Sequence, residues 1–285
     1  MEKITVIVTV YNRLKYVRNI IICLLQQTVN IHELIFADDG SKEDITNYIE
    51  DLIPLCKFKI KHVYQEDLGF RLSRSRNNAV RNSEGDYLIF LDQDVIFSED
   101  FIEKIYSQKK EKVIVYTRAL VSNEEEKEKI QKNLEKSKSF KAVYNLVNKE
   151  QEKITKKAIL KDRIYNILYF LKLRKRGGKI AGLMFSLYKK DFIAINGFDE
   201  KYKAYGYEDD DFCNRFFKYG KGTKIVRFNM YPIHMYHYFD PTKKYDLNKN
   251  YYYIRKKQIS KLNFKCQYGY INSIDKDKVI LTGIN

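Results

Sequence analysis

Short runs of β-branched and aliphatic residues alternate with longer, helix-length segments through the first 95 residues, and this alternation restricts the fold more than any other feature. Strands are expected at 4–10, 33–37, 58–64 and 86–91. Helices are expected between them at 14–27, 43–53 and 73–82. Strands joined through helices need crossover connections, which place the strands parallel. The sequence therefore predicts an α/β fold with a mostly parallel sheet.

The later part of the chain has a different pattern. A further strand is expected at 113–120, and residues 122–176, which contain no Gly or Pro, are expected to form helices. Gly177 and Gly178 end this helical stretch. The expected elements after it are a strand at 180–188, a loop at 196–207 and a helix at 212–219.

The net charge of +16 is unevenly distributed. Residues 122–179 carry 17 Lys and Arg against 8 Asp and Glu, and residues 241–285 carry 10 against 3. The other residues carry 26 of each sign. Such basic segments suit nucleic acid, anionic lipid head groups or anionic glycans, and a solvated lysine-rich surface explains them equally well.

Several classes of protein are excluded by what the sequence lacks. No apolar run approaches the roughly 18–20 residues that span a bilayer. The first eight residues do not have the pattern of a signal peptide, so we expect a cytoplasmic location. The cysteines have no CxxC spacing and are expected to be reduced thiols, outside any disulfide framework or zinc site: Cys23, Cys56, Cys213 and Cys266.

Polar residues follow the expected strands at the edge where ligands bind in parallel sheets. The most informative group is Asp92-Gln93-Asp94, directly after the strand at 86–91. Two carboxylates spaced this way can share a hard divalent cation with a substrate diphosphate. The alternative is a pair of turn or N-cap aspartates ahead of a helix at 99–106.

A second acidic group, Glu208-Asp209-Asp210-Asp211, lies between an aromatic, glycine-containing loop and the helix at 212–219. Helix capping accounts for one or two acids at such a position, but not for four. A general base is a carboxylate held near an acceptor hydroxyl. The preceding tyrosines, which include Tyr205, suit the apolar face of a sugar.

Two further groups are ambiguous. His234 and His237 are three residues apart and are candidate metal ligands, although histidines in an aromatic segment are often core residues. Arg71, Arg74 and Arg76 precede the Asp92-Gln93-Asp94 turn. They are candidates for neutralising phosphates, and the alternative is a solvated helix face.

With these motifs in order, the first half resembles the inverting nucleotide-sugar glycosyltransferases of family 2, which have the GT-A fold. The matching residues are Thr5-Val6-Ile7-Val8-Thr9-Val10-Tyr11-Asn12, Asp38-Asp39-Gly40-Ser41, Arg76-Asn77 and Asp92-Gln93-Asp94. The second half resembles the carboxyl-terminal module of the β-1,4-galactosyltransferases and the bacterial chondroitin polymerase. It matches at Asn196-Gly197-Phe198-Asp199-Glu200-Lys201-Tyr202, Tyr205-Gly206-Tyr207-Glu208-Asp209-Asp210-Asp211 and Arg215.

The resemblance implies an organisation within one GT-A domain. Residues 1–121 would bind the nucleotide sugar, and residues 180–240 would bind the acceptor and supply the catalytic base. The resemblance covers about 1–120 and 180–240. It leaves out a helical basic insertion at 122–179 and a basic C-terminal tail at 241–285.

The resemblance also implies roles on the donor side. Asp39 would contact the uracil, with Thr9 and Tyr11 lining the nucleotide pocket. Asp94 would ligate Mn²⁺ or Mg²⁺ directly, and Asp92 would hold the ribose or act through water. Arg76 would lie beside the nucleotide base or the diphosphate, and Arg71 would also bind the donor.

On the acceptor side, Asp209 would be the general base, with Glu208, Asp210 and Tyr205 binding sugar hydroxyls or stacking on the sugar. His237 would complete the metal site. The galactosyltransferases have Met three residues before that histidine, where this chain has His234, so either histidine is a candidate ligand.

Taken together, the resemblance implies a metal-dependent hexosyltransferase. It would move a Gal, GalNAc, Glc or GlcNAc-type sugar from UDP to a glycan or lipid-linked glycan, with a β linkage, in bacterial capsule or lipopolysaccharide synthesis. The alternative is a non-catalytic glycan- or membrane-surface-binding protein that keeps the fold. Nucleic acid is not an expected partner, because no recognition motif is present and the first half is neutral.

The two basic segments also suggest peripheral contact with the inner face of a membrane. Apolar residues at 164–171 precede a cationic stretch at 172–179, and Tyr251–Tyr253 stand beside Arg255–Lys257. A basic aromatic helix can lie in a membrane interface. The alternative is that 164–171 packs into the acceptor half and the lysines are only solvated.

Overall fold

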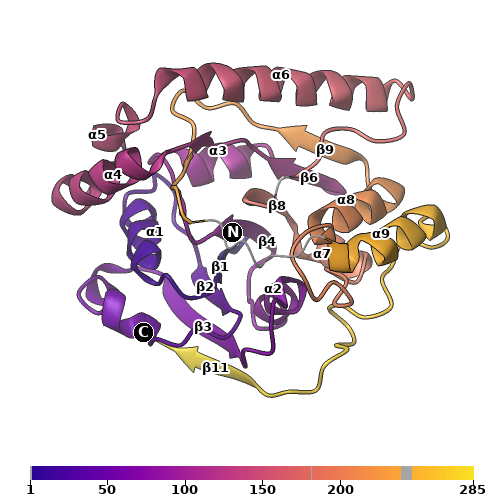
Figure 1. Ribbon diagram of the computed structural model, residues 1–285, viewed down its shortest axis with the longest axis horizontal. Helices are drawn as coiled ribbons and strands as arrows, with labels where there is room; N and C mark the ends of the chain where they lie inside the picture. The colour runs from indigo at the N-terminus through magenta and orange to yellow at the C-terminus, as the bar shows by residue number, and fades with distance from the viewer. Residues whose placement is uncertain (1, 181, 239–245) are drawn as a thin grey trace.

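The computed structural model describes residues 2–180, 182–238 and 246–285. Its centre is an eight-stranded sheet in the order β11-β3-β2-β1-β4-β8-β6-β9 (Figure 1). The strands are β1 (Ile4–Val10), β2 (Glu33–Asp38), β3 (Lys59–Gln65), β4 (Tyr87–Asp92), β6 (Val113–Tyr116), β8 (Met184–Tyr188), β9 (Gly222–Ile225) and β11 (Val279–Gly283). A small second sheet has the order β5-β10-β7, with β5 (Val95–Ile96), β7 (Leu120–Val121) and β10 (Ile233–His234).

The pairing confirms an α/β fold with a mostly parallel sheet. β1 pairs in parallel with β2 and β4, β2 with β3, and β6 with β9. The antiparallel pairs are β4 with β8, β6 with β8, and β3 with β11. Every residue of β1 and β2 is buried, as is usual for central strands covered on both faces.

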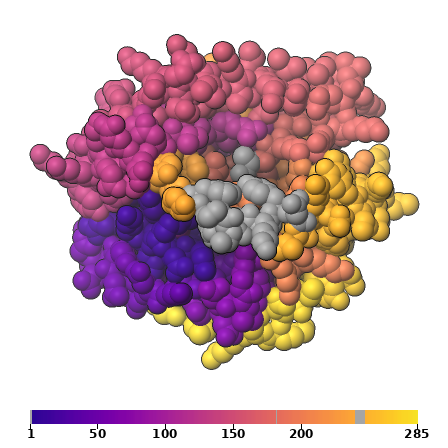
Figure 2. Space-filling view, in the orientation of Figure 1, coloured from indigo at the N-terminus to yellow at the C-terminus, as the bar shows by residue number. Residues whose placement is uncertain are grey.

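Helices surround this sheet. They are α1 (Lys15–Leu25), α2 (Leu72–Arg81), α3 (Phe101–Ser107), α4 (Glu124–Ser137), α5 (Phe140–Tyr144), α6 (Lys149–Phe170), α7 (Lys189–Ala194), α8 (Glu208–Tyr219) and α9 (Asp246–Gln258). The helices expected within 122–176 are therefore present as α4, α5 and α6. Helix α6 lies across one edge of the molecule, and its residues form the upper rim of the face shown in Figure 2. Within the described residues, no helix is long and apolar enough to cross a membrane.

Three expected elements differ in the structure. The prediction of a helix at 43–53 is wrong, because only two short 3₁₀ helices form there, η1 (Ile45–Tyr48) and η2 (Ile53–Leu55). The side chain of Asp44 accepts a hydrogen bond from the backbone N–H of Thr46 and starts η1. Pro54 lies in η2, and proline disrupts a continuous α-helix.

The strand expected at 113–120 is also divided. β6 ends at Tyr116, and the chain turns so that β7 pairs with β10 in the small sheet.

Helix α8 begins at Glu208 rather than at 212, so the four acids form its first turn. Free N–H groups and the helix dipole favour carboxylates there.

The strand register places the ends of the central strands together. Val10 pairs with Asp38 across β1 and β2, and Thr9 pairs with Asp92 across β1 and β4. The residues that follow these three strands therefore meet at one edge of the sheet, as expected for a ligand site in a parallel sheet.

Candidate active site

A cavity of about 600 Å³ lies at this edge of the sheet. Of the residues that the sequence marks as candidates, all except Arg71, Arg74 and Asp210 line it. They are Thr9, Tyr11, Asp39, Arg76, Asp92, Asp94, Tyr205, Glu208, Asp209, His234 and His237. Residues from six separate stretches of the chain thus share one cavity, whose size is typical of small-molecule sites.

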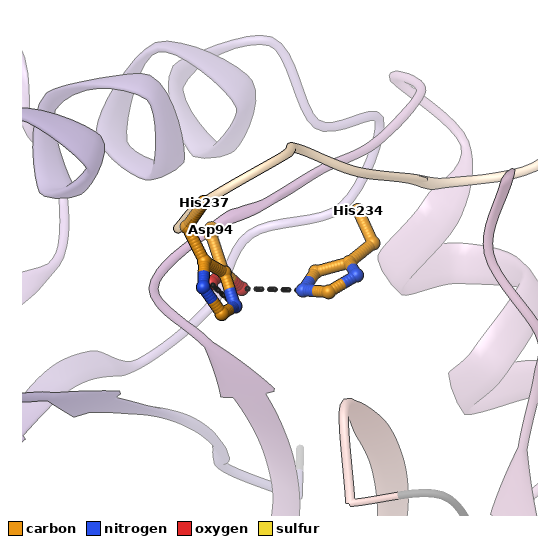
Figure 3. Close-up of side chains that lie close together, drawn as sticks. All are labelled: Asp94, His234 and His237. Carbon is orange, nitrogen blue, oxygen red and sulfur yellow. Dashed lines mark ion pairs between the residues drawn. The ribbon is translucent and has the colours of Figure 1, made fainter. Parts of the chain in front are cut away.

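Asp94, His234 and His237 form a compact group of ligand-type side chains (Figure 3). Asp94 follows β4, and the antiparallel pairing of β10 with β5 places His234 opposite Val95. His234 Nε2 is 3.4 Å from Asp94 Oδ1, and His237 Nε2 is 3.3 Å from Asp94 Oδ2. Asp94 Oδ1 is buried and has no hydrogen-bond partner among the residues that the structure describes.

The electrostatics of this group suit a cation. Burial acts to raise the pKa of Asp94, but His234, His237 and Arg13 outweigh it and hold the pKa below its usual value. Burial lowers the pKa of His237, which favours the neutral imidazole. Metals bind the ionised carboxylate and the neutral imidazole. A carboxylate oxygen and two imidazole nitrogens, all within 4.8 Å of one another, therefore fit a divalent ion such as Mn²⁺.

A buried arginine connects the two acidic motifs. Arg76 is 1% exposed, and its Nη1 donates to Asp209 Oδ1 at 2.9 Å. Its Nη2 lies 3.4 Å from Asp92 Oδ1. The guanidinium also lies over the ring of Phe198, 5.0 Å from the ring centre. Arg76 therefore contacts the two carboxylates, a position that its sequence neighbourhood did not indicate.

The carboxylates that Arg76 joins are raised in pKa by burial. Burial raises the pKa of Asp209, Asp210 adds to this, and Arg76 opposes it. Burial also raises the pKa of Asp92, against the charge of Arg76. Thr9 Oγ1 donates to Asp92 Oδ1 at 2.7 Å, which orients that carboxylate. A carboxylate with a raised pKa is a stronger base than one in water.

The other acids at the start of α8 point in different directions. Glu208 lines the cavity, and burial together with Asp209 raises its pKa to about 8. Asp210 Oδ2 accepts from Lys179 Nζ at 2.6 Å and from the Tyr252 hydroxyl at 2.7 Å. Asp211 accepts from Arg215 at 2.6 Å, and both side chains are fully buried. Separate partners therefore hold three of the four adjacent carboxylates, those of Asp209, Asp210 and Asp211.

Asp39 is held from two sides at the end of β2. Its Oδ1 accepts from Gln65 Nε2 at 2.6 Å, and its Oδ2 accepts from the backbone N–H of Arg71 at 2.7 Å. Burial raises the pKa of Asp39 to about 7, although both donors oppose it. Tyr11 lies nearby and donates from its hydroxyl to Asp67 at 3.1 Å.

The side chain of Arg71 lies outside the cavity. Arg71 Nη1 is 2.9 Å from Asp277 Oδ1, and Arg74 Nη1 is 2.8 Å from Asp277 Oδ2. These two arginines anchor the segment before β11, some 200 residues away in sequence. The expectation that they neutralise phosphates has no support in this geometry.

Sequence reasoning also missed residues that line the cavity. Arg13 Nη1 is 4.0 Å from Asp94 Oδ2, and its position just after the first strand was an available signal. Gly182 lies against Asp209, since a Cβ on Gly182 would be 2.2 Å from Asp209 Oδ2. Lys203 and Phe70 also line the cavity, without a recognisable local motif.

Comparison with known families agrees with this arrangement. The model of glycosyl transferase family 2 matches residues 5–191. The chain belongs to this family. The model described as the N-terminal domain of galactosyltransferase matches residues 162–238, which include Asp209, His234 and His237. The resemblance to these families is therefore confirmed.

Individual relatives each match about a third of this chain. An uncharacterized glycosyltransferase of Rickettsia conorii is 37% identical over 103 residues, 35% of this chain and 16% of that protein. Glycosyltransferase GlyA of Streptococcus pneumoniae is 32% identical over 107 residues, 38% of this chain and 15% of that protein. Chondroitin synthase of Escherichia coli is 34% identical over 96 residues, 33% of this chain and 14% of that protein. The matched segments thus span about a sixth of the length of these relatives.

Solved structures share the fold. TarS 1–349 of S. aureus in complex with UDP-GlcNAc has a TM-score of 0.59 at 14% identity, over 90% of this chain and 65% of that one. The mannosyltransferase PcManGT of Pyrobaculum calidifontis, in complex with GDP-Man and Mn²⁺, has a TM-score of 0.53 at 13% identity, over 90% of this chain and 61% of that one. These likenesses confirm the GT-A fold.

Proposed function

We propose that this protein is an inverting, metal-dependent glycosyltransferase that moves a hexose from a UDP-sugar to a glycan hydroxyl. The observation that carries the proposal is the shared cavity, in which the Asp94, His234 and His237 group lies together with the half-buried Asp209, which is held by Arg76. Family membership and the nucleotide sugars named in the TarS and PcManGT complexes support it.

The donor would lie along the ends of β1, β2 and β4. Asp39 would accept a hydrogen bond from the uracil imide, and Thr9 and Tyr11 would line the nucleotide pocket. Asp92, held by Thr9 and Arg76, would contact the ribose. Asp94, His234 and His237 would hold Mn²⁺ or Mg²⁺, which supplies positive charge beside the leaving diphosphate when bound.

The acceptor would enter from the side of α8. Its hydroxyl oxygen would form the new bond to the anomeric carbon while the bond from that carbon to the diphosphate breaks. The hydroxyl proton would pass to Asp209, and UDP would leave. This single displacement inverts the anomeric centre and yields a β linkage from an α-linked donor. Burial of Asp209 raises its pKa and so strengthens it as a base.

Neighbouring residues would orient the acceptor and the base. Tyr205 packs edge-on against Phe70, with 5.7 Å between the ring centres, and both line the cavity where a sugar would lie. Glu208 would bind a sugar hydroxyl. Asp210, bound to Lys179 and Tyr252, would act on the position of α8.

The acceptor class is also part of the proposal. We infer a glycan or lipid-linked glycan of a bacterial surface polysaccharide, made at the cytoplasmic face of the membrane with peripheral membrane contact. The similarity to chondroitin synthase supports a polysaccharide product. The main alternative is a non-catalytic glycan-binding protein that retains the fold.

The test is a screen of UDP-Gal, UDP-GalNAc, UDP-Glc and UDP-GlcNAc for UDP release, with Mn²⁺, with Mg²⁺ and with a chelator. We expect one donor to be turned over with metal and the chelator to abolish turnover. Donor binding by calorimetry without UDP release under any condition would support the non-catalytic alternative. Full activity in the chelator would contradict metal dependence.

A further inference from the structure

The outward face of α6 carries an apolar stripe. The buried residues of α6 are Thr155, Ile159 and Asp162, which face the body of the protein. The opposite side of the helix carries four apolar residues, which are spaced four, three and four positions apart and are between 46% and 59% exposed. These residues form what we call the outer stripe: Leu160, Ile164, Ile167 and Leu171.

The outer stripe continues past the end of the helix. Leu173 lies beyond α6 and is 71% exposed, and Phe170, the last residue of α6, is 85% exposed. Helix α6 lies at the rim of the molecule, with the rest of the chain on one side of it (Figures 1 and 2). Contiguous apolar surface of this kind on a soluble domain marks an interaction site, since isolated exposed apolar residues are common but rows of them are not.

The outer stripe is flanked by positive charge. From Lys153 to Arg176 the only acidic residue is Asp162, which is buried and accepts from Arg118 Nε at 2.8 Å. The exposed basic residues of this segment are Lys153, Lys156, Lys157, Lys161, Arg163, Lys172 and Lys175. The face is therefore apolar and cationic, with no exposed acid among its described residues.

A small basic pocket lies beside the outer stripe. This hollow of about 250 Å³ is lined by Lys156, Lys157, Arg163 and Arg227, together with Ile159, Leu160 and Tyr231. Lys156 pairs with Glu152. Lys157, Arg163 and Arg227 form no ion pair or hydrogen bond with the described part of the chain. Three unpaired cations at one hollow are suited to a phosphate group.

We propose that the outer stripe and the basic pocket form a docking surface for an anionic lipid bilayer. The stripe would enter the interfacial region, and the pocket would take a lipid phosphate. A helix with apolar and cationic residues on one exposed face binds in this way. A second copy of the chain is a poor occupant, because a symmetric contact would place these cations against one another.

The role of this docking surface rests on the proposed function, because docking would bring the cavity to a membrane-bound acceptor. The proposal also assigns the surface to α6, the residues just after it and Arg227. Two tyrosines of α9 are used inside the protein, where the Tyr252 ring stacks on Tyr207 at 4.7 Å and the Tyr251 hydroxyl donates to Asp199 at 2.7 Å. The proposed docking surface therefore does not depend on the tail segment.

The test is co-sedimentation of the full chain with phosphatidylcholine vesicles and with vesicles that also contain phosphatidylglycerol, at low and high salt. No donor or acceptor is present, so the result does not depend on transfer. We expect binding to the anionic vesicles, weakened by salt. Arg163→Gln with Arg227→Gln should lower partition about 30-fold, from about 1 kcal/mol per cation near an anionic surface. Ile164→Ser with Ile167→Ser should also lower it.

Matched controls remove the same groups elsewhere. Lys132→Gln with Lys136→Gln on α4 removes two exposed charges, and Leu55→Ser with Leu262→Ser removes two exposed leucines. Both controls should bind anionic vesicles nearly as the native chain does. Equal binding to both vesicle types, no binding, or equal losses in controls and test variants would overturn the proposal. A dimer in solution that dissociates in the Ile164→Ser, Ile167→Ser variant would also overturn it, in favour of a second copy.

Discussion

Arg76 Nη1 donates to Asp209 Oδ1 at 2.9 Å, although the two residues are 133 positions apart. The same guanidinium reaches Asp92 at the end of β4. One buried cation therefore joins the motif assigned to the donor with the motif assigned to the base, and the relative position of the two motifs depends on it.

Asp209→Asn should abolish transfer while donor binding survives. The substitution keeps the shape of the side chain and removes the proton acceptor, and a general base typically contributes about 10²–10⁴-fold. UDP-sugar affinity by calorimetry and turnover by UDP release separate the two effects. Asp210→Asn is the matched control and should have a smaller effect on turnover, because Asp210 is bound to Lys179 and Tyr252. The reverse order would move the base to Asp210.

Arg76→Lys should move the pH dependence of turnover. Lysine keeps the charge but cannot donate to both carboxylates in the same geometry. Arg76 opposes the rise in the pKa of Asp209, so weakening this contact should raise that pKa further. The base must be deprotonated to act, so the acidic limb of the kcat profile should shift to higher pH. If the maximal kcat falls while the pH of the acidic limb stays the same, Arg76 acts on folding alone.

Asp94→Ala, His234→Ala and His237→Ala should each weaken Mn²⁺ binding. Electron paramagnetic resonance of Mn²⁺ titrated into the protein gives this directly, without any activity measurement. His32→Ala is the control, since His32 pairs with Glu84 and is not among the cavity residues. Turnover should fall by orders of magnitude in Asp94→Ala. If only one histidine variant loses Mn²⁺ affinity, the other imidazole is not a ligand.

Gly182→Ala should lower both turnover and stability. Gly182 has φ of +75°, which costs an L-residue roughly 1–2 kcal/mol, and its Cβ would lie 2.2 Å from Asp209 Oδ2. Gly69 has φ of +87° with no atom within 4 Å of its Cβ position. Gly69→Ala should therefore show a similar loss of unfolding free energy without moving Asp209. Urea unfolding and kcat are measured for both variants. Both should lose unfolding free energy through backbone strain, and only Gly182→Ala should also lose kcat, because only there does the new Cβ displace Asp209.

Asp39 should make the protein less stable as the pH rises from 4 to 7. Burial raises the pKa of Asp39 to about 7, so in this interval the folded state keeps a proton that the unfolded state has lost. The contribution of Asp39 to the unfolding free energy should therefore fall with pH and level off above pH 7. Asp39→Asn lacks this contribution, so its stability relative to the native chain should increase over the same range.

A control of opposite sign is available at Asp44. Its hydrogen bond from the Thr46 backbone lowers the pKa of Asp44, so its contribution to stability is present above its unfolded pKa and lost as the pH falls. In denaturant unfolding, Asp39→Asn should therefore gain stability relative to the native chain as the pH rises from about 4 to 7, whereas Asp44→Asn should lose relative stability as the pH rises to about 4 and stay level above it. Parallel trends would contradict the assignment for Asp39.

The sequence by itself determined the strands and what stands at their ends. Alternation and burial patterns are local properties, and the register of a parallel sheet then brings Thr9, Asp39 and Asp92 to one edge. The polar segment at 43–53 was mistaken for a helix because its apolar content is too low to choose between a helix and short turns. Proline and the Asp44 cap decided the outcome locally.

Only the tertiary structure decided which charged groups meet. Three arginines at the start of one short helix looked alike, yet Arg71 and Arg74 bind Asp277 while Arg76 turns inward to Asp92 and Asp209. The adjacent acids Asp209 and Asp210 are likewise separated, because different distant partners hold them. A buried charge is stable only beside a partner, and those partners come from segments up to 206 residues away, which local patterns do not specify.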